Sequence, residues 1–133
     1  MFIDTSFCVD LMRENRRSEP GAATAKLVSL GKTGLYLSLF SLCELRAGAE
    51  LSSNPKEELR KVENILSYVS LVRPDAAFPV IYGEMEAFLR KAGTHVPVMD
   101  LLIGCTVKVA GVPILTRDTH HFERIPGVLV EHY

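Results

Sequence analysis

The chain has 133 residues, of which 47% are hydrophobic and 23% are charged. This size fits one compact domain, residues 1–133, and excludes a two-domain enzyme. Fifteen Lys and Arg against sixteen Asp and Glu leave a formal net charge of -1, so any binding of nucleic acid must be local. No apolar run reaches the ~20 residues that a membrane span requires, and the first ten residues lack the pattern of a secretion signal. We therefore expect a cytoplasmic protein without membrane contact, in which Cys8, Cys43 and Cys105 are buried thiols.

Short apolar runs alternate with helical patterns along the whole chain. Residues 1–3 predict a strand, and Asp4, Thr5 and Ser6 are polar residues of the kind that begin a helix. Further strands are predicted at residues 35–38, 112–116 and 128–130, and helices within residues 7–12, 22–30, 41–50, 55–69, 78–89 and 100–110. Strands that alternate with helices are typical of an α/β fold with a mostly parallel central sheet covered on both faces.

Four carboxylates adjoin apolar segments that should be buried. Asp4 follows the first strand, and Asp118 comes shortly after the strand at 112–116. Glu44 lies in the apolar segment 38–49, and Asp100 begins the apolar helix predicted for the middle of the protein. In a doubly wound sheet, the ends of strands and the starts of helices share one edge, where ligands bind. We therefore expect the four acids to meet in one cleft.

Each of these acids also has a purely structural explanation. Asp4 and Asp100 fit helix caps, Ser41 and Glu44 fit a capping box, and Asp118 fits an Asx-turn. Taken together, however, four partly buried carboxylates repel one another unless a cation offsets their charge. Hard oxygen ligands select Mg²⁺ or Mn²⁺ over zinc. The residues therefore favour a divalent-metal site over four unrelated caps.

Acids that hold a hard divalent cation suit phosphoryl chemistry, because the cation makes a bound water acidic enough to attack at neutral pH. Signals for competing chemistries are missing: the sequence has no G-x-S-x-G elbow, no P-loop and no G-x-G-x-x-G motif. His120 and His121 would face apart in an extended segment, so we interpret them as structural residues and not as metal ligands.

Four segments together resemble the PIN-domain ribonucleases, and within them the VapC-like toxins of toxin–antitoxin pairs. They are FIDTS at residues 2–6, SLCELRAGA at 41–49, MDLLIGCTV at 99–107 and ILTRDTHHFERIPGVLVEHY at 114–133. The resemblance implies a three-layer α/β/α sandwich and a metal-activated water that hydrolyses RNA phosphodiester bonds. It also implies a set of catalytic acids that bind Mg²⁺ or Mn²⁺: Asp4, Glu44, Asp100 and Asp118.

The resemblance extends to supporting residues and partners. Thr5, Ser6 and Thr116 match hydroxyl positions that border the acids, and we assign them supporting hydrogen bonds. Val98 stands where relatives often carry a further acid, which leaves the number of metal ions open. Relatives commonly form homodimers and are inhibited by a small VapB-like antitoxin whose tail enters the acidic cleft.

Three arginines are candidates for contact with RNA or with the antitoxin: Arg46, Arg117 and Arg13. A guanidinium pairs well with phosphate, and each of these residues is expected near the predicted site. Two other functions stay open at this point. One is a PIN-like module that binds RNA or protein without catalysis, and the other is a metal-dependent nuclease that acts on DNA.

Overall fold

The computed structural model describes residues 1–133 and contains a five-stranded sheet in the order β3-β2-β1-β4-β5. All neighbouring strands are parallel. The strands are β1 (Phe2–Ile3), β2 (Tyr36–Ser38), β3 (Ser70–Val72), β4 (Ile114–Leu115) and β5 (Val130–Glu131). The first strand of the sequence is thus the central strand of the sheet, and residues that follow it lie at the middle of the sheet's carboxyl edge.

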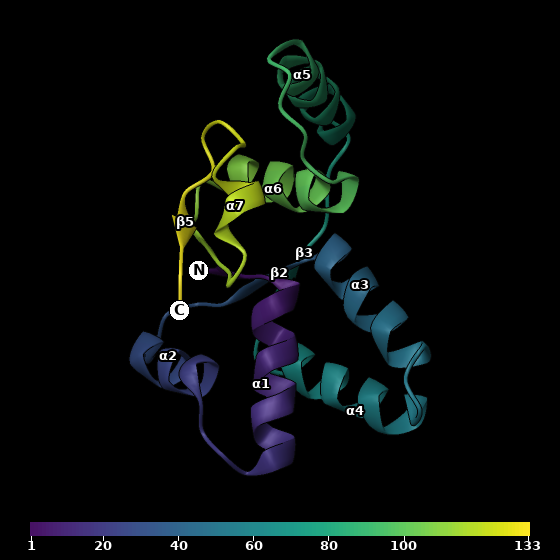
Figure 1. Ribbon diagram of the computed structural model, residues 1–133, viewed down its shortest axis with the longest axis vertical. Helices are drawn as coiled ribbons and strands as arrows, with labels where there is room; N and C mark the ends of the chain where they lie inside the picture. Colours follow the sequence, from purple (N-terminus) through teal and green to yellow (C-terminus); the bar gives the residue numbers. More distant parts are fainter.

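Helices cover both faces of this sheet. They are α1 (Thr5–Arg17), α2 (Ala22–Leu30), α3 (Leu39–Glu50), α4 (Pro55–Leu66), α5 (Phe78–Lys91), α6 (Val98–Ala110) and α7 (Thr119–Phe122). Figure 1 shows α5, α6 and α7 on one side and α1, α2 and α4 on the other. The predicted three-layer α/β/α sandwich is confirmed. None of the helices is long and apolar enough to cross a membrane.

Adjacent residues of the central strands explain why the sheet needs two helical layers. Phe2 and Ile114 pack into a core with α5 and α6, whereas Ile3 and Leu115 pack into a second core with α1, α3 and α4. Successive strand residues point to opposite faces, and all four of these side chains are at most 1% exposed. A sheet that is apolar on both faces must be covered twice.

Three details differ from the expectations for the sequence. β3 is absent from the strands that the sequence predicts, because this edge strand has one exposed and two partly buried residues and no clear alternation. The proposed capping box of Ser41 and Glu44 is wrong: α3 begins at Leu39, and the hydroxyl of Ser38 accepts a hydrogen bond from the Phe40 N–H at 3.1 Å. Cys43 is exposed and not buried.

A glutamate from α1 caps the start of α2. Glu14 accepts hydrogen bonds from the backbone N–H groups of Gly21, Ala23 and Thr24 at 3.0, 3.1 and 2.8 Å, and from the Thr24 hydroxyl. These are donors that a helix start leaves without a partner inside the helix. Burial works against the charged form, but the hydrogen bonds, the largest from Thr24, outweigh it and lower the pKa of Glu14.

We predict that Glu14→Gln lowers the free energy of unfolding by about 1–2 kcal/mol, because the amide keeps the side chain's size but not its charge. A lowered carboxyl pKa stabilises the fold above the ordinary glutamate value of 4.5, and this contribution is lost as the pH falls from that value through the lowered one. Urea denaturation at pH 7 and in acid measures both effects. Glu19→Gln, at an exposed position, is the control. Equal stability of the two variants at pH 7 would contradict the capping role.

Candidate active site

Asp4 lies at the end of the central strand and is 6% exposed. It is the N-cap of α1, and its Oδ2 accepts hydrogen bonds from the Ser6 hydroxyl and from the Thr116 hydroxyl, both at 2.9 Å. Its backbone N–H donates to the Leu115 carbonyl at 3.0 Å, which continues the pairing of β1 with β4. Asp4 therefore acts as a helix cap, as its structural explanation proposed, and also presents a carboxylate at the edge of the sheet.

Glu44 reaches the same region from the middle of α3. The hydroxyl of Thr5, the first residue of α1, donates to its Oε2 at 2.6 Å. Burial raises the pKa of Glu44; the hydrogen bond from Thr5 opposes this, and the nearby charges of Asp4 and Asp100 raise the pKa further. The pKa of Glu44 thus reflects the proximity of three of the four predicted acids.

Asp100 lies in the first turn of α6. Burial raises its pKa, His121 opposes the rise, and the charges of Asp4 and Asp118 add to it. Asp118 is the most exposed of the four acids, with 60% of its side chain accessible. Its backbone N–H donates to the Thr116 hydroxyl at 3.0 Å, so Thr116 bridges Asp4 and the segment that carries Asp118.

His121 is a site residue that our interpretation of the sequence missed. Its Nδ1 lies 2.9 Å from Asp100 Oδ2 and 3.7 Å from Asp118 Oδ2, so the imidazole stands between two of the acids. The expectation of an extended segment was wrong, because Thr119–Phe122 form the short helix α7. The spacing of three residues between Asp118 and His121 places both on one helix face, and this spacing was the available signal.

The acids at this edge offer carboxylate oxygens, the type of ligand that a hard divalent cation prefers. Asp4, Glu44 and Asp100 each use one oxygen in the hydrogen bonds described, and the structure records no hydrogen bond to the other oxygen. Burial, and after it the charges of neighbouring carboxylates, raise the pKa of Glu44 and of Asp100. No three or more His, Cys, Asp and Glu side chains form a group that could hold a metal ion, so the ligand assignment stays a prediction.

The three arginines differ in their surroundings. Arg117 donates from Nη1 to Asp10 Oδ2 at 2.6 Å, and Arg13 Nη1 lies 3.6 Å from the other oxygen of Asp10. Arg46 instead pairs with Glu63 of α4. Arg117 is next to Asp118 in sequence and its backbone N–H donates to the Ser6 hydroxyl, which places it beside the acids. Arg46 is held by α4.

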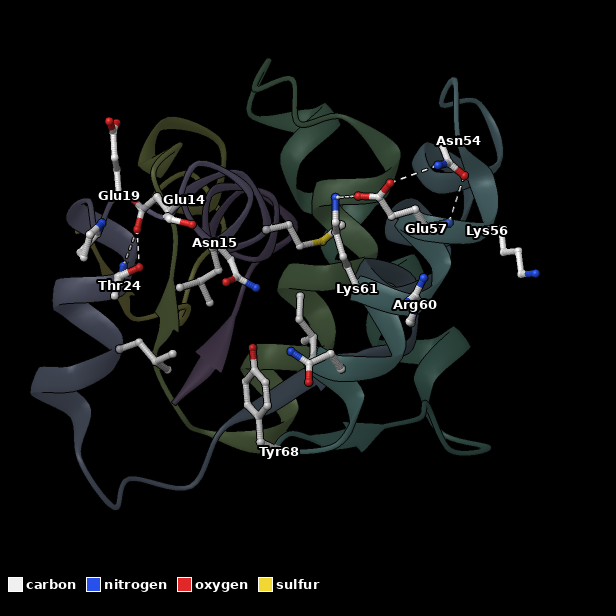
Figure 2. A pocket seen from close by; sticks show the side chains of 17 residues that line it. Glu14, Asn15, Glu19, Thr24, Asn54, Lys56, Glu57, Arg60, Lys61 and Tyr68 are labelled. Atoms are coloured by element: carbon white, nitrogen blue, oxygen red, sulfur yellow. Dashed lines mark hydrogen bonds and ion pairs between the residues drawn. The ribbon is translucent and has the colours of Figure 1, made fainter.

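A separate groove of about 1210 Å³ lies between α1, α2 and α4. Its apolar lining residues include Leu11, Leu27 and Ile65, and Figure 2 shows the polar groups around them, among them Lys61 directed toward Glu57. None of the four acids lines this groove. The molecule thus has two distinct surfaces. One is the acidic edge at the carboxyl ends of the strands, formed by Asp4, Glu44, Asp100 and Asp118. The other is a groove with polar and apolar lining beside the last half of α1.

Comparisons with known proteins agree with this geometry. The PIN domain family matches residues 1–128, and the chain belongs to this family. The tRNA(fMet)-specific endonuclease VapC of Shigella flexneri is 29% identical over 129 residues, covering 97% of this chain and 94% of the relative. The protein of the same name from Salmonella typhimurium is 31% identical over 103 residues, covering 77% of this chain and 78% of the relative.

Solved structures also match this chain over nearly its full length. The DNA-bound VapBC complex from Salmonella typhimurium contains a chain that matches with a TM-score of 0.86 at 27% identity, covering 98% of this chain and 96% of that one. A chain of VapBC2 from Rickettsia felis, bound to a DNA fragment from their promoter, matches with a TM-score of 0.89 at 24% identity, covering 99% and 97%. This second match, at 24% identity, shows the fold alone. The match to the PIN domain family confirms the family that the sequence resembles.

We predict that Glu44→Gln raises the thermal unfolding midpoint at pH 7 in buffer containing EDTA. A raised carboxyl pKa means that the folded state disfavours the charged form of Glu44. The free energy of unfolding therefore falls as the pH rises from the ordinary glutamate value through the raised one. The amide keeps an oxygen that accepts from Thr5 and removes the repulsion. Glu50→Gln, at an exposed position of α3, is the matched control. A lower midpoint for Glu44→Gln than for the control would contradict the inference that the charge of Glu44 destabilises the fold.

Proposed function

We propose that this protein is a divalent-metal-dependent endoribonuclease and the toxin of a toxin–antitoxin pair. The observation that carries the proposal is the buried carboxylate of Asp4 at the carboxyl edge of the central strand, whose charge adds to the raised pKa values of both Glu44 and Asp100. The VapC names of the relatives supply the reaction class, because two of them are called endonucleases specific for tRNA(fMet). The residues 1–133 act as one PIN domain in this proposal.

The four acids hold Mg²⁺ or Mn²⁺ in the proposed site. When bound, such a cation supplies charge neutralisation and activates water for attack on a phosphodiester. Asp4 is held by hydroxyls on two sides, from Ser6 and Thr116, and this fixes the direction in which its other oxygen points. Thr5 does the same for Glu44. These three hydroxyl residues keep the supporting role that the sequence predicted for them.

His121 and Arg117 border the acids of the proposed site. His121 Nδ1 lies between Asp100 and Asp118, and its 2.9 Å contact orients the Asp100 carboxylate. Arg117 offers a guanidinium at the rim, where an RNA phosphate approaches the acids. Arg13, which shares Asp10 with Arg117, is a second phosphate contact, whereas the pairing of Arg46 with Glu63 makes Arg46 the weakest of the three candidates.

The proposed partners follow from the relatives. Several structural neighbours are VapBC toxin–antitoxin complexes, and we assign this chain a VapB-like antitoxin that blocks the acidic edge. A homodimer and a cytoplasmic location, where RNA substrates are present, complete the proposal. A transfer RNA is the first substrate to test, because two relatives bear that specificity in their names.

We predict that the purified protein cleaves RNA in the presence of Mg²⁺ or Mn²⁺ and that EDTA stops the reaction. Asp4→Asn and Asp100→Asn each lower kcat by at least about 100-fold, because each variant removes a charge that the cation requires. Gel analysis of labelled transfer RNA and of a DNA of matched sequence measures the rates. Asp75→Asn, at an exposed position outside the acidic edge, is the matched control and keeps wild-type activity.

Three outcomes would overturn this function. Cleavage that persists in EDTA or in both Asp→Asn variants would contradict the metal mechanism. Faster cleavage of DNA than of RNA would favour the alternative nuclease. RNA binding without cleavage in every cation tested would identify a binding module, and isothermal titration with Mg²⁺ and Mn²⁺ would then show whether the acids bind a cation at all.

A further inference from the structure

Asp10 joins three parts of the chain that are distant in sequence. It lies on α1, one helical turn after Ser6, and only 16% of its side chain is exposed. Its Oδ2 accepts from Arg117 Nη1 at 2.6 Å and from the hydroxyl of Tyr133 at 2.9 Å, and its Oδ1 lies 3.6 Å from Arg13 Nη1. Neither Asp10 nor Tyr133 belongs to the acidic edge described above.

Tyr133 is held firmly enough to orient Asp10. Its ring packs edge-on against the fully buried ring of Phe7, with the ring centroids 4.8 Å apart and the planes at 86°. Burial raises the pKa of Tyr133, and the hydrogen bond to Asp10 raises it further. The raised pKa keeps the hydroxyl protonated at neutral pH, as the donor of its 2.9 Å hydrogen bond to Asp10.

The same network continues into the acidic edge. The Arg117 backbone N–H donates to the Ser6 hydroxyl at 3.2 Å, and that hydroxyl donates to Asp4 Oδ2 at 2.9 Å. Arg117 is thus fixed at two points, its backbone against the first turn of α1 and its guanidinium against the next turn. Its side chain remains 54% exposed, so it borders solvent beside the acids.

A guanidinium in this position needs a restraint. Asp118 is its neighbour in sequence, and a bidentate pair with an acid of this edge would block that acid and consume the donors that a phosphate requires. Asp10 engages only Nη1, and the other N–H donors of Arg117 have no partner in the structure. Two arginines on one aspartate also leave this spot with a surplus positive charge.

We propose that Asp10 and Tyr133 are positioning residues, which hold Arg117 ready to bind a phosphate of the RNA beside the acidic edge. This inference rests on the proposed ribonuclease function and adds two residues to it. Preorganisation of a charged side chain strengthens binding mainly by lowering the entropy lost when the complex forms. The effect therefore belongs to RNA binding and KM and not to the chemical step.

The experiment is a double-mutant cycle between Tyr133→Phe and Arg117→Ala, measured as kcat and KM for RNA cleavage with Mg²⁺. Tyr133→Phe keeps the ring on Phe7 and removes one hydrogen bond, so KM rises about fivefold with kcat nearly constant. In the Arg117→Ala background the same substitution has no further effect on KM. Tyr82→Phe, whose hydroxyl makes no hydrogen bond in the structure, is the matched control.

RNA affinity measured by fluorescence anisotropy in the inactive Asp100→Asn background separates binding from catalysis. There, Arg117→Ala lowers the slope of log affinity against log salt by about 1, as loss of one phosphate contact requires. Asp10→Asn is the second variant for the positioning role, and circular dichroism verifies the folding of each protein. We expect Asp10→Asn, like Tyr133→Phe, to raise KM only when Arg117 is present.

The outcomes distinguish the two levels of the proposal. If the wild-type protein neither cleaves nor binds RNA, the proposed function and the positioning role both fail. If it cleaves RNA but Tyr133→Phe and Asp10→Asn leave KM unchanged, or raise it equally without Arg117, only the positioning role is overturned. If these variants weaken antitoxin binding and not RNA binding, Arg117 serves the protein partner, and the phosphate role is wrong.

Discussion

Asp4 is a charged group buried at the end of the central strand, and its neighbours are arranged to satisfy it. An isolated buried carboxylate costs several kcal/mol, so the hydroxyls of Ser6 and Thr116 must come from two different elements to the same oxygen. This requirement joins the start of α1 to the end of β4. Thr116 then accepts from the backbone of Asp118, so a single buried charge fixes the place of a second acid. The position of the acidic edge follows from the solvation of Asp4.

The charged carboxylates of the acidic edge lower the free energy of unfolding. Glu44 and Asp100 have raised pKa values because burial and neighbouring carboxylates disfavour their charges, which opposes folding at neutral pH. The chain offsets this with a few local groups, His121 between two acids and the hydroxyl of Thr5 on Glu44. In the rest of the chain, positive charges outnumber negative ones: without the four acids, twelve Asp and Glu remain against fifteen Lys and Arg. A nearly neutral composition thus combines an acidic edge with a mildly basic remainder.

The sequence was informative where a side chain's surroundings depend on its immediate neighbours. Asp4 after an apolar strand and Asp100 in an all-apolar helix stood out because burial could be inferred locally, and the α/β pattern then placed them on one edge. The sequence did not predict β3, because an edge strand of three residues is too short to show a periodic pattern. The contact of Tyr133 depends on a partner far along the chain, Asp10, which lies 123 residues away. No local spacing encodes such a meeting. His121 is different, because its spacing of three residues from Asp118 is a local signal that the expectation of an extended segment hid. The family resemblance predicted the four acids together.

The two cores are joined through strands of only two residues. Phe2 and Ile114 belong to one core, and their direct neighbours Ile3 and Leu115 belong to the other. A loss of packing on either face therefore removes the support of the same backbone hydrogen bonds, which run between β1 and β4. The helical layers are not independent units that can open in turn; the short central strands make the unfolding of one layer the unfolding of both. Asp4 and Asp118, which follow these two strands, therefore lose their positions when either helical layer unfolds.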